Sequence, residues 1–146
     1  HITAQAPAVI GGALVVPVGL LTRLLGAAPA TGDGSSPEAR RRVELAAMAA
    51  VIQAEKGLGF VPRDVSAAKV GYDIESRIPG TGRLRFIEVK GRAEGASTVT
   101  VTRNEILVAL NKPEEFVLAL VAIPPQGTPA TAAVRYLRRP FTREPE

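Results

Sequence analysis

The sequence contains no cysteine and a single histidine, His1, which stands at the first position. Without cysteine the chain can form no disulfide, no thiolate zinc site and no cysteine nucleophile, and this usage is compatible with a reducing compartment. We therefore expect a cytoplasmic protein. A histidine at the very start of a chain is poorly placed to orient a serine nucleophile, so hydrolysis by a Ser-His-Asp triad is not expected.

The sequence also lacks an apolar run long enough to cross a membrane. Residues 8–21 are nearly all apolar, but these 14 residues fall short of the roughly 20 that a bilayer requires. No basic segment precedes them, and Gly11, Gly12 and Pro17 interrupt them, so a secretory signal is not indicated. The pattern instead favours a buried strand at 13–16 and a short helix at 17–25, with no membrane contact.

The overall composition suits one globular domain with a polyanionic partner. The 146 residues carry a formal net charge of +4, which is a modest basic excess. Small residues at 27–36 indicate a linker between an N-terminal flanking segment, 1–26, and a domain, 37–141, which leaves 142–146 as a tail. Because the chain opens with His and not Met, we expect a piece of a longer protein, with residues 1–26 as the junction.

The domain should begin with a helix. Ser35 stands three residues before Glu38, a capping-box spacing, and Pro37 suits a first turn, so we predict a helix to about Lys56 with Gly57 as its C-cap. Its buried stripe of small residues would be Val43, Ala46, Ala47, Ala50, Val51 and Ala54. Later segments predict an edge strand at 60–66, a half-buried strand at 97–102, a capped helix at 103–110, a buried strand at 116–123, a loop at 124–131 and a last strand at 134–137.

Between these elements, GYDIES (71–76) and RLRFIEVKGR (83–92) predict a β-hairpin, because both are short, rich in β-branched and aromatic residues, and bounded by Gly and Pro. A type II′ turn centred on Gly80 and Thr81 would pair Ile74 with Ile87. The same register pairs Tyr72 with Val89, which makes one face wholly apolar. A shift of one residue would mix polar and apolar side chains on both faces.

This register sets Asp73 directly against Glu88, with Lys90 nearby on the same face. Two opposed carboxylates, with β-carbons roughly 4.5–5.5 Å apart, repel each other and call for a cation between them. Lys90 is one candidate and a divalent metal ion is the other, since Mg²⁺ prefers carboxylate oxygens and keeps several waters. A surface hairpin with solvated charges is the alternative interpretation. The order of elements indicates an α/β sandwich with a mixed sheet.

An acidic residue on one strand followed by Glu-x-Lys on the next, here Asp73, Glu88 and Lys90, resembles the motif of the PD-(D/E)xK nuclease superfamily. Tyr72 stands where that motif often has proline. The wider pattern, GYDIES, RFIEVKGR, VTVTRNEI and a hydrophobic strand within residues 36–141, is similar to the helicase-associated domain named after the C-terminus of the plant protein NO VEIN. The resemblance implies a restriction-endonuclease-like sandwich, with a central mixed β-sheet flanked by helices.

The same resemblance implies a nuclease module that depends on Mg²⁺ or Mn²⁺. Asp73 and Glu88 would bind the metal with help from the Val89 carbonyl. Lys90 would orient or deprotonate the attacking water. The helix-borne Glu44 would be an outer ligand.

The implied partners are nucleic acid, DNA rather than RNA, and helicase domains of the same polypeptide, because this domain commonly lies at the C-terminal end of large DEAD-like helicases in bacteria and archaea. Arg92, Arg103 and Asn104 are candidates for contacting nucleic acid, and the two arginines are otherwise solvated surface groups. The alternative function is a catalytically silent nucleic-acid-binding or protein-interaction domain of a helicase-related protein.

Overall fold

The structure is a computed structural model that describes residues 36–124 and 132–144, all of which fall in one structural unit, Ser35–Pro145. The strand predicted at 13–16, the helix at 17–25, all but the last residue of the linker, and nearly all of the loop at 124–131 lie outside the described residues. Of the helices in the described part, none has the length and hydropathy that a bilayer crossing requires.

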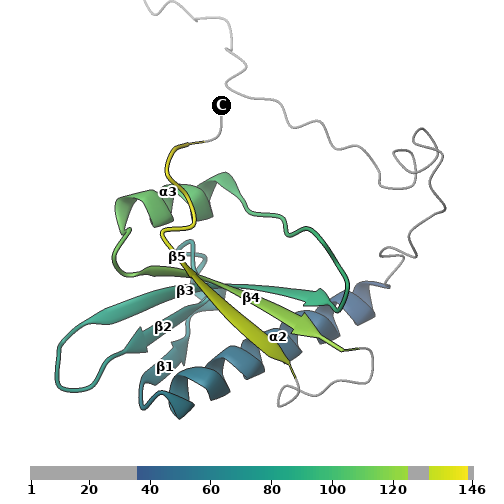
Figure 1. Ribbon diagram of the computed structural model, residues 1–146, viewed down its shortest axis with the longest axis horizontal. Coiled ribbons are helices and arrows are strands. Elements are labelled where there is room, and N and C mark those ends of the chain that lie inside the picture. The colour runs from purple at the N-terminus through teal and green to yellow at the C-terminus, as the bar shows by residue number, and fades with distance from the viewer. Residues whose placement is uncertain (1–35, 125–131, 145–146) are drawn as a thin grey trace, which may run out of the picture. The chain divides into compact units, whose positions relative to one another are not determined.

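The described residues of this unit form two helices, a short 3₁₀ turn and five strands (Figure 1). In chain order they are α2 (Pro37–Gly57), β1 (Val61–Asp64), η1 (Ser66–Ala68), β2 (Ile74–Arg77), β3 (Leu84–Ala93), α3 (Arg103–Asn111), β4 (Phe116–Ile123) and β5 (Ala133–Arg138).

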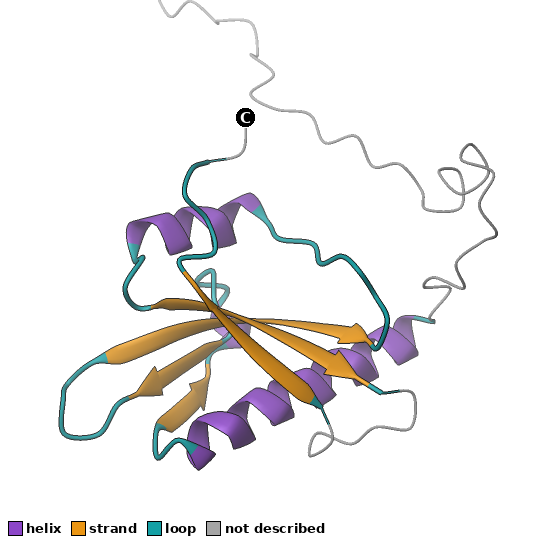
Figure 2. Cartoon of the chain, in the orientation of Figure 1, coloured by secondary structure: helices purple, strands orange, loops and turns teal. Residues whose placement is uncertain are grey.

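The strands form one mixed sheet in the order β1-β2-β3-β4-β5, with β3 and β4 parallel and the other neighbours antiparallel. Figure 2 shows α2 along one face of the sheet and α3 over the other. This arrangement confirms the predicted α/β fold with a mixed sheet. The nuclease-like sandwich within that class stays a prediction.

The N-cap of helix α2 stands one residue later than predicted. Ser36 is the N-cap, and its hydroxyl accepts a hydrogen bond from the amide of Ala39 at 3.2 Å. The predicted N-cap, Ser35, lies outside the described residues. Pro37 occupies the first turn as expected, and the helix ends at Gly57 with Leu58 as the C-cap.

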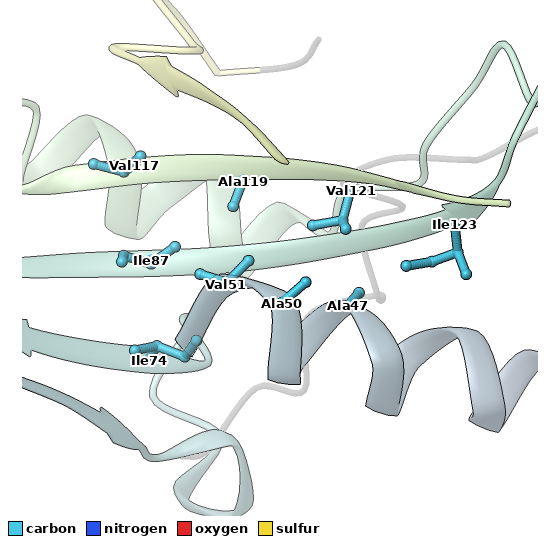
Figure 3. Close-up of a cluster of buried hydrophobic side chains, with 9 residues drawn as sticks. All are labelled: Ala47, Ala50, Val51, Ile74, Ile87, Val117, Ala119, Val121 and Ile123. Atoms are coloured by element: carbon cyan, nitrogen blue, oxygen red, sulfur yellow. The ribbon is translucent and has the colours of Figure 1, made fainter. Parts of the chain in front are cut away.

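The small-residue stripe of α2 packs on the sheet, as predicted. Figure 3 shows the resulting core of nine buried side chains, Ala47, Ala50, Val51, Ile74, Ile87, Val117, Ala119, Val121 and Ile123. The helix approaches β3 so closely that a β-carbon at Gly91 would lie 2.6 Å from the β-carbon of Ala47. Glycine in the strand therefore permits the close contact between the helix and the sheet.

The predicted hairpin register is confirmed. Ile74 pairs with Ile87, Glu75 with Phe86, and so on to the turn. This pairing fixes which residues of β3 face each layer. Ile87 joins the core under α2, while Phe86, Glu88 and Lys90 project to the α3 side.

The turn itself differs from the predicted type II′. The amide of Thr81 donates to the carbonyl of Ile78 at 3.4 Å, so Pro79 and Gly80 are the central residues. Gly80 has φ +74°, and proline followed by a positive φ is typical of a type II turn. The predicted register is preserved because the connection between Ile78 and Arg83, residues 79–82, is centred between Gly80 and Thr81, as predicted.

The prediction for Tyr72 is wrong. Its ring packs on that of Phe86, with the centroids 4.6 Å apart, and therefore lies on the α3 side and not opposite Val89 on the α2 side. Strand β2 starts only at Ile74, and Gly71, with φ +91°, turns the chain just before. The alternation of side chains that holds inside a strand does not extend back to Tyr72.

The strand predicted at 97–102 is also absent, since this segment has no regular secondary structure. Strand β3 is already paired on both sides, and the chain must return from the end of β3 to the start of the parallel β4. The segment serves this crossover. The other predictions hold: β1 is an edge strand, α3 has its capping box, β4 is buried, and β5 follows it.

A buried ion pair links the C-terminal end of α2 to the sheet. The guanidinium of Arg85 lies 3.2 Å from the carboxylate of Glu55, whose side chain is fully buried. Arg85 also lies over the rings of Phe60 and Tyr136, at 5.3 and 5.2 Å from their centroids. Both charges are thus removed from water, and each depends on the other.

Arg85→Met should lower the free energy of unfolding by about 3–5 kcal/mol, because Glu55 would remain buried without its cation. The double variant Glu55→Leu, Arg85→Met should recover most of this loss. Urea denaturation of the variants checks both, with Arg63→Met as the control, since the Arg63–Glu75 pair is exposed and should contribute less than about 1 kcal/mol. A double variant no more stable than Arg85→Met would contradict the prediction.

Candidate functional site

Asp73 is held against the backbone of β3. Its carboxylate accepts a hydrogen bond from the amide of Val89 at 2.9 Å, and its own amide donates to the carbonyl of Ile87 at 2.9 Å. These two bonds flank Glu88 in the sequence. The structure therefore places Asp73 beside Glu88, but through these hydrogen bonds, since the ladder of β2 and β3 begins only at Ile74.

Lys90 connects the sheet to α3. Its ammonium nitrogen lies 2.8 Å from Glu88 Oε1 and 2.9 Å from Glu105 Oε2, and all three side chains are largely buried. Glu105 also completes the capping box of α3 by accepting a hydrogen bond from the amide of Thr102 at 2.9 Å. One carboxylate thus both caps the helix and binds it to the sheet through Lys90.

The carboxylates of Asp73, Glu88 and Glu105 border a cleft of about 220 Å³, which we call the acidic cleft. Its lining includes Ser66, Lys69, Tyr72, Asp73, Glu88, Asn104 and Glu105. Glu88 and Asp73 come from the hairpin, and Asn104 and Glu105 from the first turn of α3. Polar groups from distant parts of the chain therefore converge on one space, as is usual for a binding site.

Burial changes the proton affinity of the carboxylates. It raises the pKa of Glu88 to about 8, and repulsion from Asp73 adds to this effect while Lys90 opposes it. Burial also raises the pKa of Asp73, against the hydrogen bond from Val89. For Glu105, burial is outweighed by Lys90 and the capping bonds, so its pKa is lowered. Perturbed carboxylates in a cleft are typical of functional sites.

Lys90 is held in its charged form. Burial alone would lower the pKa of its ammonium group, but the hydrogen bonds to Glu88 and Glu105 outweigh burial and raise it. The site therefore combines a permanent cation with two carboxylates, Asp73 and Glu88, whose protonated forms are favoured by burial.

The donor set fits a hard divalent cation in part. Asp73 and Glu88 offer carboxylate oxygens in one cleft, the type of ligand that Mg²⁺ accepts while keeping several waters. Within residues 36–124 and 132–144, no group of three Asp, Glu, His or Cys side chains is placed to enclose a metal ion. The protein would therefore provide two ligands to a bound metal ion, the carboxylates of Asp73 and Glu88.

The structure separates the remaining predicted residues. Glu44 is exposed on α2, on the opposite side of the sheet, and is not brought to the carboxylates. Asn104 lines the acidic cleft. Arg103 is exposed and its guanidinium lies 3.4 Å from the carboxylate of Glu144. Arg92 donates from Nε to the carbonyl of Thr98 at 2.9 Å and lines a different cavity.

Two charged residues that line the acidic cleft, Glu105 and Lys69, are absent from the sequence-based candidates. The capping-box spacing does place Glu105 at the third position of a helix, but nothing in that spacing brings the helix start over Lys90. Lys69 ends the 3₁₀ turn with φ +52°, a left-handed conformation that is uncommon outside glycine. No local sequence signal marks it.

One comparison with known proteins gives a match. A family model described as Protein NO VEIN, C-terminal, matches residues 43–134 of the chain. No curated protein and no solved structure matches the chain. The matched range contains every residue that lines the acidic cleft.

In metal-free buffer, Glu88→Gln should make stability less dependent on pH. A carboxyl whose pKa rises from 4.5 to about 8 on folding contributes its full stabilisation below pH 4.5 and loses it as the pH rises to about 8. The stability advantage of Glu88→Gln should therefore grow across this window, by up to about 1.4 kcal/mol per pH unit.

Urea denaturation at several pH values in EDTA measures this difference. Glu114→Gln is the matched control, because Glu114 forms an exposed ion pair with Arg139, and its substitution should change the free energy of unfolding by less than about 1 kcal/mol. Parallel pH profiles for wild type and Glu88→Gln would show that burial does not raise the pKa of Glu88.

Proposed function

The chain belongs to the Protein NO VEIN, C-terminal family, and on that premise we propose that it is a metal-dependent nuclease module that acts on nucleic acid together with helicase domains of the same polypeptide. The observation that carries the proposal is that Asp73 and Glu88 line one cleft, while the ammonium group of Lys90 lies 2.8 Å from Glu88. Phosphodiester hydrolysis needs such a combination of oxygen ligands and positive charge.

Asp73 and Glu88 would hold Mg²⁺ or Mn²⁺. When bound, such an ion supplies a Lewis acid that polarises a phosphoryl oxygen and offsets developing negative charge. Asp73 is oriented for this role by the amide of Val89, which occupies one lone pair of Oδ2 and leaves Oδ1 for another partner. Because the carboxylates repel each other, a cation bound between them would relieve that repulsion.

Lys90 has a narrower role than the sequence motif implies. Its raised pKa keeps the amine protonated at neutral pH, so it cannot take a proton from water. We assign to Lys90 the orientation of water or of a phosphate oxygen and the stabilisation of negative charge in the transition state. Lys69 and Asn104 at the rim of the acidic cleft would contact the phosphate.

A catalytically silent binding domain is the second candidate function. The specific observation in its favour is that Lys90 already has two carboxylate partners, Glu88 and Glu105, and so resembles a structural ion-pair network. This candidate predicts salt-dependent binding of nucleic acid without cleavage.

Cleavage of labelled single- and double-stranded DNA and of RNA in Mg²⁺ or Mn²⁺ separates the two candidates. Asp73→Asn and Glu88→Gln should each reduce cleavage by at least about 100-fold, because each removes a charged metal ligand while keeping its shape. Glu38→Gln, which alters an exposed carboxylate at the start of α2, should cleave like wild type.

EDTA should abolish the activity in every case. Equal cleavage by wild type, Asp73→Asn and Glu88→Gln would identify the activity as contamination and contradict the nuclease proposal. Binding without any metal-dependent cleavage would favour the silent domain.

A further inference from the structure

A second cavity, of about 350 Å³, lies on the same side of the sheet as α3. We call it the basic cavity, because its lining contains three cationic side chains, Lys90, Arg92 and Arg135. The hydroxyl residues Ser97 and Thr98 and the small residue Ala133 are also part of the lining. No acidic residue among those described lines it.

The register of three strands explains how the cations meet. Lys90 on β3 pairs with Leu120 on β4, which pairs with Arg135 on β5, so these three side chains form one row across the sheet. The next row consists of Arg92, Ala122 and Ala133. The small side chains of Ala122 and Ala133 leave room above the sheet. The segment after β3, which includes Ser97 and Thr98, forms a wall of the basic cavity.

The two arginines keep hydrogen-bonding capacity. Arg92 uses Nε to donate to the carbonyl of Thr98, which fixes the direction of its guanidinium while its two Nη atoms retain their donors. Within the described residues, neither Arg92 nor Arg135 forms an ion pair. Two guanidinium groups without carboxylate partners, in one cavity, are suited to a phosphate.

The basic cavity adjoins the acidic cleft through Lys90. This residue lines the basic cavity, while its ammonium group contacts Glu88 and Glu105, which line the acidic cleft. A polymer with regularly spaced phosphates could therefore occupy both. No aromatic residue among those described lines the basic cavity, so base stacking is not the means of recognition.

We propose that the basic cavity binds the sugar–phosphate backbone of a nucleic-acid strand, next to the segment held at the acidic cleft. Arg92 and Arg135 contact the phosphates, and recognition is independent of base sequence. This inference rests on the nucleic-acid part of the proposed function and not on turnover.

The test is binding of a fluorescein-labelled single-stranded DNA oligonucleotide to the full chain, measured by anisotropy in EDTA at several salt concentrations. Arg135→Ala and Arg92→Ala should each raise Kd roughly five- to tenfold, because each removes a charge-assisted hydrogen bond. Each should also reduce the slope of log K against log salt by about 0.7, the value for one phosphate contact on a single strand.

Two further variants make the test specific. Arg138→Ala removes the same charge from the same strand, but Arg138 lies on the face of Val134 and Tyr136, away from the basic cavity, and should leave Kd nearly unchanged. Ala133→Leu fills the basic cavity at an exposed strand position without altering charge, and should weaken binding.

Arg135→Ala and Arg92→Ala that bind like wild type, or no more weakly than Arg138→Ala, would overturn the inference. Failure of DNA and of an RNA of the same sequence to bind wild type would overturn it as well. Binding that depends on Arg135 without any cleavage would sustain the inference while the nuclease proposal fails. Metal-dependent cleavage with binding that does not depend on Arg135 would sustain the nuclease proposal and overturn the inference.

Discussion

The two ion pairs of Lys90 hold together the side of the sheet that faces α3. Its ammonium group contacts Glu88 on its own strand and Glu105 at the start of α3, and its charge also acts on Asp73. Buried carboxylates are costly unless a cation compensates them. One lysine therefore compensates the carboxylates at the acidic cleft and links the start of α3 to the sheet, while Ala109 of α3 packs with Phe116 and Leu118 of β4.

Much of the hairpin could be predicted from the sequence, because the constraint that sets it is local. Alternation leaves one register in which Ile74 meets Ile87 on an apolar face. Asp73 lies just before this ladder, and its hydrogen bonds to Val89 and Ile87 hold it beside Glu88. The turn chemistry mattered less, since the type II turn lies within a four-residue connection, 79–82. The hydrogen bond from the amide of Ile78 to the carbonyl of Arg83 closes this connection in the predicted register. The capping box and the buried strand β4 were equally predictable, as each rests on neighbouring residues alone.

The errors arise where a longer-range constraint overrides the local pattern. The alternation at 97–102 is typical of a strand, but the parallel pairing of β3 and β4 requires a crossover there. Tyr72 lies outside the ladder and is free to pack on Phe86. Glu105 has a clear local role as a cap, yet its contact with Lys90 follows only from where α3 lands on the sheet. Glu44 likewise lies on the opposite side of the sheet from the acidic cleft, because the packing of α2 and not the local sequence pattern decides its position.

Lys90 also joins two surfaces of opposite charge, and this decides which residues can separate binding from chemistry. Of these two spaces, Asp73 lines the acidic cleft and Arg135 the basic cavity. Lys90 lines the basic cavity and forms ion pairs with Glu88 and Glu105, which line the acidic cleft. An ammonium group has three donors, and the two ion pairs of Lys90 use two of them. The third donor is available to a phosphate. A strand bound in the basic cavity could therefore contact Lys90 without displacing Glu88 or Glu105, and its negative charge would favour the protonated lysine as the carboxylates do.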